Sequence, residues 1–322
     1  MDLQFTFLGI SSGVAKLFVL VSAGYLIYRL KLTDDVFLDK LGLLLVRIFF
    51  PALIVSKIIS RFSFSEFSSW WVLPVSAAVF SIVGVAIGAA VSGLRKDHAS
   101  AKEFVCSIGF QNSGYLPMNL ILFSFAGDIA DRLLIYMFLF IVGFDLLMWS
   151  LVPIFLTGDF KKRFKWTVFL NPPVIATVFS LLWVALVGKG SMPAFVMEPM
   201  AQVGQACFPL VLLTLGAYLS RYRAYRPTHK SPVILSMAIK LFCFPLLVLA
   251  GLCIIPAAMM GIDLKFFLFL EAIMPTAVSL VIIGTYTGAD NRFFSSAIFY
   301  SHLFSIVTIP IWLQIFKSIF GG

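Results

Sequence analysis

A run of polar and helix-breaking residues, Gln111-Asn112-Ser113-Gly114-Tyr115-Leu116-Pro117-Met118-Asn119, interrupts an apolar stretch that extends from about 104 to 125. Amide and hydroxyl groups can hydrogen-bond a ligand, and Gly and Pro disfavour an unbroken helix. A second run, Glu271-Ala272-Ile273-Met274-Pro275-Thr276-Ala277, interrupts another apolar stretch. Backbone released by such breaks is tolerated at membrane depth only where protein or a water-filled cavity satisfies it. Paired breaks of this kind indicate a binding site.

The chemistry that the two runs favour is the binding of an anion. Helices that restart at Pro117 and near Pro275 present unpaired N–H groups, including those of Thr276 and Ala277, and the positive ends of their dipoles. Two such ends that converge form an anion site. The alternative is a pair of proline kinks with capping side chains and no ligand. The candidate substrate-binding residues are Asn112, Ser113, Gly114, Tyr115, Pro117, Asn119, Pro275, Thr276, Ala277 and Ser279.

Ionisable residues inside apolar stretches are the second chemical signal, because they are costly in a membrane and usually functional. Glu271 and Gln111 are candidates for binding a coupling Na⁺ or H⁺, although Glu271 also fits a carboxylate at the outer interface. Arg47 and Asp145 fall near the centres of their stretches and suggest a structural ion pair, with a substrate role as the alternative. For His302 we expect a hydrogen-bonded packing role, with a titrating side chain as the alternative.

The composition places these residues in a membrane protein. Of the 322 residues, 61% are hydrophobic and only 12% are charged, and most of the chain divides into apolar runs near the roughly 20 residues that a spanning helix needs. We therefore predict an all-α membrane protein with ten transmembrane helices and no soluble domain. The predicted spans are 5–28, 37–59, 70–93, 104–125, 132–156, 168–188, 197–219, 232–256, 264–285 and 293–316.

Charge predicts the orientation of these spans. Fifteen Lys and Arg residues fall in or next to the loops on one side, and six fall on the other. The positive-inside rule assigns the first side to the cytoplasm, so both termini are predicted outside the plasma membrane, which in bacteria is the inner membrane. The net charge of +9 is then explained by topology and by contacts with anionic membrane lipid, and no nucleic acid partner is expected.

Proline spacing indicates an internal repeat. Pro51 precedes Pro117 by 66 residues, and Pro209 precedes Pro275 by the same interval, so the two halves are offset by 158 residues. Because each half has five spans, the halves are inverted relative to each other in the membrane. We predict a first repeat at 1–160, a second at 161–322, and broken, crossing helices at the fourth and ninth spans.

No enzyme signature is present: the chain lacks HExxH, GxSxG and GxxxxGK[ST], and its three His and four Cys residues form no metal-ligand spacing. We expect no enzymatic activity and no resident cofactor beyond a coupling Na⁺ or H⁺.

Six motifs occur in order along the chain: 47–59, 112–115, Asn171-Pro172-Pro173, 213–217, 274–278 and Gly288-Ala289-Asp290. They resemble those of the auxin efflux carrier family, in its bacterial branch of malate and malonate permeases, over essentially the whole chain. The resemblance implies a ten-span carrier of carboxylates or auxin-like acids with an elevator-like movement, and the fold is distantly similar to that of sodium–bile acid symporters. The chain departs from the family pattern at Pro117, Asn119 and Ser279.

We therefore predict a secondary membrane transporter of a small organic anion, by efflux or uptake, with the anion bound at the crossing of the broken helices. The alternatives are a sodium- or proton-coupled symporter of amphipathic, bile-acid-like anions and a membrane receptor that binds without transporting. The sequence leaves open whether the chain forms a homodimer.

Overall fold

The computed structural model describes residues 7–95, 100–158, 171–223 and 230–321. Within these ranges every regular element is a helix, and the sole β-type pairing is one isolated bridge. The predicted boundary between the repeats at 160/161 lies outside the described residues, as do the predicted cytoplasmic residues Lys96, Lys161, Lys162, Arg163, Lys165 and Arg226. The all-helical prediction is confirmed for the described part of the chain.

Seven helical segments are long and apolar enough to cross a membrane. A shorter apolar helix, α9 (Pro172–Leu186), covers the predicted sixth span. The seven segments are α1 (Phe7–Arg29), α2 (Asp35–Leu44) continued through α3 (Phe50–Arg61), α4 (Val72–Leu94), α7 (Gly127–Thr157), α10 (Ala194–Tyr222), α11 (Lys230–Ala238) continued through α12 (Phe244–Ile254), and α15 (Asn291–Phe320).

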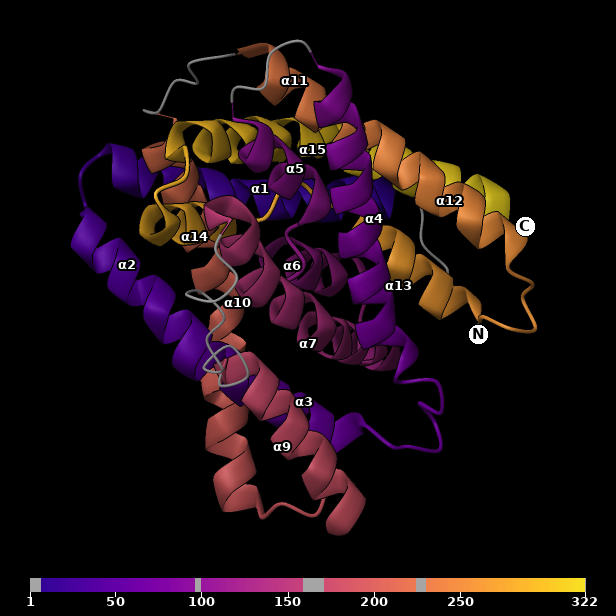
Figure 1. The fold of residues 1–322 in the computed structure, drawn as a ribbon. Helices are drawn as coiled ribbons and strands as arrows, with labels where there is room; N and C mark the ends of the chain where they lie inside the picture. Colours follow the sequence, from indigo (N-terminus) through magenta and orange to yellow (C-terminus); the bar gives the residue numbers. More distant parts are fainter. Residues whose placement is uncertain (1–6, 96–99, 159–170, 224–229, 322) are drawn as a thin grey trace.

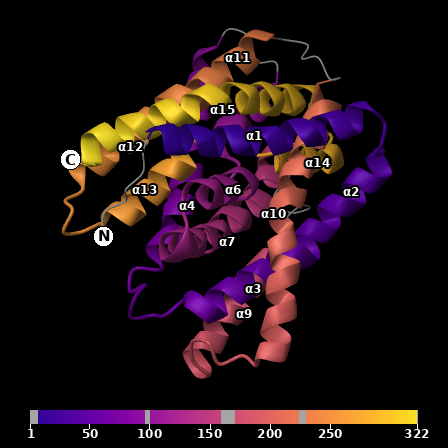
Figure 2. The same cartoon turned by 180° about the vertical axis from the view of Figure 1, so that it is seen from behind.

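The two predicted breaks are present. The predicted fourth span consists of α5 (Ala101–Gly109) and α6 (Tyr115–Ser124), and the ninth consists of α13 (Ile262–Ala272) and α14 (Ser279–Thr287). Figure 1 shows α6 in the middle of the molecule, surrounded by the long helices. The start of α1 and the end of α15 lie on the same side of the bundle (Figure 2).

Two long segments contain a turn of π-helix just before a Phe-Pro pair, at Leu45–Phe49 and at Ile239–Cys243. Proline has no N–H and its ring clashes with the carbonyl four residues earlier, so the helix widens locally. For Pro245 that carbonyl belongs to Leu241, and it accepts a hydrogen bond from Trp312 Nε1 at 2.8 Å. The widened turn contains Lys240, whose side chain is fully buried.

Close contacts between helices divide the bundle into two groups. α10 packs against α1 and α3, and α3 packs against α9. A Cβ at Gly216 would lie 1.9 Å from the carbonyl oxygen of Val21, so α10 and α1 are in backbone contact, as small residues allow in membranes. α4 packs in the same way against α5, where a Cβ at Gly84 would lie 2.8 Å from Gly109 Cα. We call α1–α3, α9 and α10 the first group, and α4–α7 with α11–α15 the second group; α3, α9 and part of α10 project from one end of the molecule (Figures 1 and 2).

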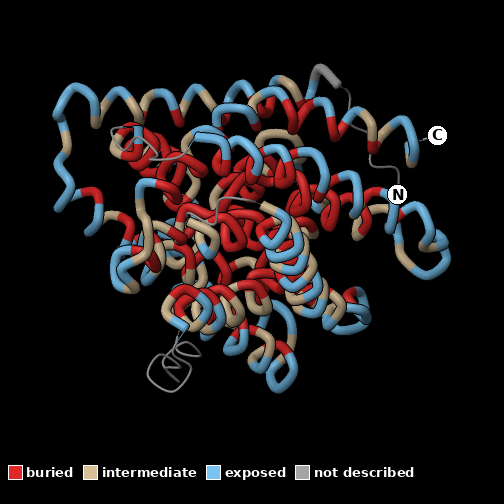
Figure 3. Tube along the Cα trace, turned by 45° about the horizontal axis from the view of Figure 1, so that its top comes forward, coloured by how far each residue is buried: buried red, intermediate tan, exposed pale blue. Residues whose placement is uncertain are grey.

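The outward faces of the bundle are apolar. Val79, Leu246 and Ile311 are examples of large hydrophobic side chains that are exposed on different helices. Figure 3 shows buried residues concentrated in the centre and exposed ones along the peripheral helices. A core that holds polar residues inside an apolar exterior is what a lipid environment requires.

Candidate functional site

The two interrupted helices cross at their breaks and hydrogen-bond to each other. The backbone N–H of Asn112 donates to the carbonyl of Pro275 at 2.8 Å, and that of Ala277 donates to the carbonyl of Phe110 at 3.0 Å. Gln111 and Thr276 form the antiparallel bridge between them. Each unwound segment thus satisfies backbone groups of the other, which a membrane interior demands.

Thr276 connects the crossing to neighbouring helices by hydrogen bonds. Its hydroxyl donates to the carbonyl of Ser107 at 3.2 Å, and its N–H donates to Ser301 Oγ at 3.3 Å. The N–H groups of Thr276 and Ala277 were predicted to bind an anion, but both are engaged within the protein. Their role in this structure is to hold the crossing together.

Asn112 is also engaged at every polar group of its side chain. Its Oδ1 accepts from the N–H of Tyr115 at 3.1 Å, and its Nδ2 lies 3.0 Å from His302 Nε2. His302 Nδ1 lies 2.8 Å from the carbonyl oxygen of Ile298, which can only accept. Nδ1 therefore carries the proton, and Nε2 accepts from Asn112. A neutral His302 satisfies both contacts, which supports the predicted packing role.

The half-helices restart at other residues than predicted. α6 begins at Tyr115, so Pro117 lies within its first turn, and Asn119 Nδ2 donates to the carbonyl of Tyr115 at 3.0 Å. α14 begins at Ser279, four residues after Pro275. Pro275 lies in the extended crossing segment, where its missing N–H costs nothing and its carbonyl pairs with Asn112. The predicted restart near Pro275 is thus displaced to Ser279.

A pocket of about 90 Å³ opens beside the crossing, at the N-terminus of α6. Ser113 Oγ and Gln111 Nε2 are buried and have no hydrogen-bond partner among the described residues. Gly114 faces open space, since nothing lies within 4 Å of the position of a Cβ. The lining residues include Val46, Phe50, Gln111, Asn112, Ser113, Gly114, Tyr115, Phe144, Asp145, Trp149, Asn171, Pro173, Ala277 and Ser279.

Asp145 lines the same pocket but is not paired with Arg47. Its Oδ2 accepts from Asn171 Nδ2 at 2.7 Å, and Arg47 is exposed on the widened turn of its segment. Among the ion pairs of the described residues none joins Arg47 to Asp145. The predicted pair is therefore absent from this structure, and Asn171 takes the place of Arg47.

A second polar cluster lies at the crossing and contains Glu271, Lys240 and Gln111. Glu271 is fully buried, and neither carboxylate oxygen has a partner at normal hydrogen-bond geometry in the described part of the chain. Ser113 and Gln111 are its polar neighbours, and the charge of Lys240 acts on it. Lys240 Nζ donates to the carbonyl of Ile108 at 3.1 Å and to Gln111 Oε1 at 3.3 Å. Nothing in the linear pattern places Lys240, which lies in the predicted eighth span, against the break of the fourth span.

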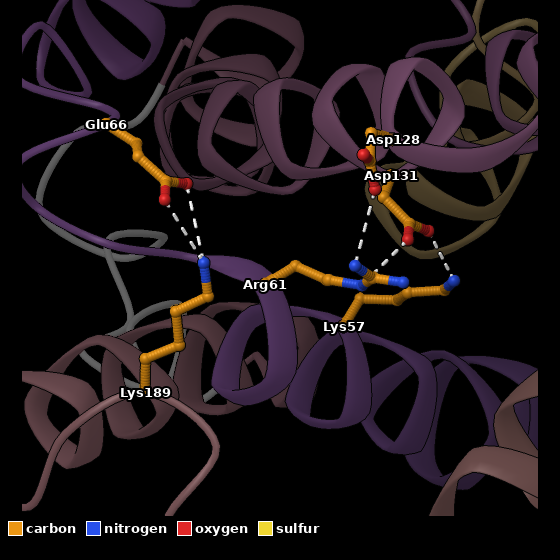
Figure 4. A network of polar contacts seen from close by, with 6 residues as sticks. All are labelled: Lys57, Arg61, Glu66, Asp128, Asp131 and Lys189. Carbon is orange, nitrogen blue, oxygen red and sulfur yellow. Dashed lines mark hydrogen bonds and ion pairs between the residues drawn. The ribbon is translucent and has the colours of Figure 1, made fainter.

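Charged residues at the end of α3 connect the two groups of helices. Arg61 Nε lies 3.0 Å from Asp131 Oδ2, and Lys57 contacts the other oxygen of the same carboxylate. Figure 4 shows both cations extending from α3 towards Asp128 and Asp131 at the start of α7. Glu66 and Lys189 form a further pair beside them, at 3.3 Å. α3 belongs to the first group and α7 to the second, so this network spans the boundary between them.

These features define a class of protein. A multi-pass membrane protein with discontinuous helices that cross at a polar pocket has the architecture of membrane transporters. Comparison with known proteins agrees. The chain belongs to the membrane transport protein family, the family of the auxin efflux carriers, whose profile matches residues 10–163 and again 156–313. The chain is 24% identical over 316 residues to an uncharacterized transporter of Methanothermobacter thermautotrophicus, with 95% of this chain and 98% of the relative covered.

Proposed function

We propose that the chain is a secondary transporter of a small organic anion, most simply a carboxylate, bound in the pocket beside the crossing. The observation that carries this proposal is the coincidence of three features: an open pocket, the N-terminus of α6, and the unpartnered Ser113 hydroxyl. A helix N-terminus offers free N–H groups and a positive dipole end, and both stabilise an anion.

The proposed donors differ from those that the sequence suggested. Three of the predicted donors are already hydrogen-bonded to protein groups and so stabilise the crossing: Asn112, Asn119 and Thr276. Ser113 and Gln111 line the pocket, and their buried donors lie near the Glu271 carboxylate without a hydrogen bond of normal geometry in the described residues. A buried donor without a partner costs roughly 1–3 kcal/mol, so a ligand that accepts from Ser113 or Gln111 recovers this free energy on binding.

The size of the pocket favours a small substrate. Its volume of about 90 Å³ is well below the roughly 300 Å³ at which pockets for drug-sized ligands begin. This favours a small mono- or dicarboxylate over the alternative of an amphipathic, bile-acid-like anion. The other alternative, a receptor that binds without transporting, has the same pocket and is distinguished by the uptake assay below.

A second substrate class follows from Asp145. Its carboxylate lines the pocket, and its hydrogen-bond partner among the described residues is a neutral side chain, that of Asn171. A negative charge there disfavours a second negative charge but favours a positive one. A zwitterion such as an amino acid, with its carboxylate at the α6 terminus and its ammonium near Asp145, satisfies both ends of the pocket.

For the transport cycle we propose ten spans in a five-plus-five inverted repeat, with both termini outside. The double match of the family profile supports the repeat. The start of α1 and the end of α15 lie on the same side of the bundle, which supports an even number of crossings (Figure 2). We propose that the second group carries the pocket across the membrane against the first group, as in an elevator. The ion pairs between α3 and α7 then hold one end state and break in the other.

Uptake into proteoliposomes of a panel of mono- and dicarboxylates and amino acids tests this function. The matched variant is Gly114→Ala, because a methyl group there meets no protein atom and narrows only the pocket. We expect uptake to fall several-fold with an unchanged melting temperature, whereas Gly251→Ala, which also adds a methyl in open space on α12, leaves uptake unchanged. If no organic anion or zwitterion is transported and none raises the melting temperature, the proposed function is wrong.

A further inference from the structure

The buried cluster at the crossing contains a cation of the protein's own. Lys240 and Glu271 are both completely inaccessible to solvent. Lys240 Nζ has two oxygen partners, the carbonyl of Ile108 and Gln111 Oε1, and it lies 4.5 Å from the centre of the Phe244 ring. Burial of a lone ammonium group in such a place is expensive, so the oxygens around it must compensate the charge.

The oxygens around Lys240 are of the kind that bind a sodium ion in transporters. Discontinuous helices coordinate Na⁺ with unwound backbone carbonyls and with the C-terminal ends of half-helices. Ile108 is the second-to-last residue of the half-helix α5, so its carbonyl lies at the negative end of that dipole. Gln111 adds an amide oxygen from the break. Glu271 forms no ion pair with Lys240 among the described residues, but its buried carboxylate charge acts on the ammonium group.

We propose that Lys240 is a built-in substitute for a coupling cation: its ammonium group occupies the position that Na⁺ would otherwise take between the oxygens of Ile108 and Gln111, near the charge of Glu271. The protein then keeps its crossing charge-balanced without a bound metal ion. With respect to transport this inference rests on the proposed function, and its consequence is that uptake does not require sodium. The same residues form a latent sodium site that removal of the lysine side chain exposes.

Thermal unfolding of purified protein in NaCl and in choline chloride at equal ionic strength tests this inference without any transport assay. We expect no sodium-specific change for the wild type. Lys240→Ala removes the ammonium and leaves space, so sodium is expected to raise its melting temperature by about 2 °C or more at concentrations well above Kd. Lys240→Met fills the space with an apolar chain and is expected to show no response to sodium.

Two controls separate a specific site from a general effect of removing a buried lysine. Lys265 is also buried and donates to the carbonyls of Leu252 and Ile255, but its hydrogen-bond partners in the described residues include no side-chain oxygen from a helix break. Lys265→Ala is therefore expected to show no sodium response. The double variant Lys240→Ala with Glu271→Gln keeps the space but loses the carboxylate charge, so the gained response should disappear.

Each result of these melting experiments either supports or contradicts the inference. A sodium-specific shift in the wild type, or none in folded Lys240→Ala, overturns the inference. If Lys240→Ala does not fold, Lys240→Ser replaces it, and the wild-type measurement stands by itself. Failure of these shifts leaves carboxylate uptake untouched, whereas absence of all uptake contradicts the proposed function and leaves the sodium shifts valid.

Discussion

Asn112 donates its backbone N–H to the carbonyl of Pro275 at 2.8 Å, so the breaks in two helices 163 residues apart in the sequence are joined directly. This bond and its partner from Ala277 to Phe110 make each unwound segment the hydrogen-bond partner of the other. The crossing therefore does not need water to satisfy this backbone. Polar side chains next to it remain available for a ligand, and the tests below separate the residues that hold the crossing from those that face the pocket.

Thr276 is predicted to contribute to stability. Thr276→Val keeps the shape of the side chain but removes the hydroxyl that donates to the carbonyl of Ser107. We expect a loss of about 1–3 kcal/mol, because a buried acceptor is left unsatisfied, seen as a lower melting temperature. Thr287→Val is the control, since the Thr287 hydroxyl donates to the carbonyl of Ile283 on its own helix at 2.8 Å. Equal melting temperatures for the two variants would contradict this assignment.

The contact between α1 and α10 is predicted to tolerate no side chain at Gly216. A Cβ there would lie 1.9 Å from the carbonyl oxygen of Val21, so Gly216→Val forces the helices apart. We expect a cost at or above the upper end of the roughly 1–3 kcal/mol seen for overpacking, with loss of monodisperse protein in size-exclusion chromatography. The same substitution at Gly251, where a Cβ meets nothing within 4 Å, is expected to leave the elution profile unchanged.

The ion pairs between α3 and α7 provide a test of relative movement of the two helix groups. The test uses a variant without the four native cysteines that carries Arg61→Cys and Asp131→Cys. A reducible cross-link between the two new thiols joins the first group to the second. We expect this cross-link to abolish uptake, and reduction to restore it. The control pair is Arg132→Cys with Asp263→Cys, whose side chains form an ion pair at 3.3 Å within the second group. Uptake that survives the first cross-link would exclude the elevator movement.

The sequence predicted the crossing better than it predicted the pocket. Gln111, Gly114 and Pro275 mark the breaks because glycine, proline and amides disfavour an unbroken helix in lipid. The sequence could not determine which donors are free, since the partners of Asn112 and Thr276, namely His302, Ser107 and Ser301, come from other parts of the chain.

The sequence also could not predict which charged residues from distant parts of the chain form pairs. Arg47 and Asp145 lie at similar depths in their spans, but depth does not determine which face of a helix a residue occupies, and Asn171 bonds Asp145 in place of Arg47. The π-helical turn that contains Lys240 depends on Pro245 together with Trp312 from another helix. A proline inside an apolar span signals a local distortion, yet its partner becomes visible only in three dimensions.

Asp145 is predicted to control which charges the pocket accepts. Asp145→Asn keeps an oxygen that can accept from Asn171 Nδ2 but removes the negative charge from the pocket lining. Repulsion of a dicarboxylate then weakens and attraction of an ammonium group is lost, so affinity for dicarboxylates relative to amino acids should rise roughly tenfold, which corresponds to about 1.4 kcal/mol. Competition for uptake in proteoliposomes measures this ratio. Asp34→Asn is the matched control, because Asp34 caps α2 with its side chain and asparagine serves equally well at that position. An unchanged ratio in Asp145→Asn would show that the substrate does not reach Asp145, and it would place the bound anion entirely at the Ser113 end of the pocket.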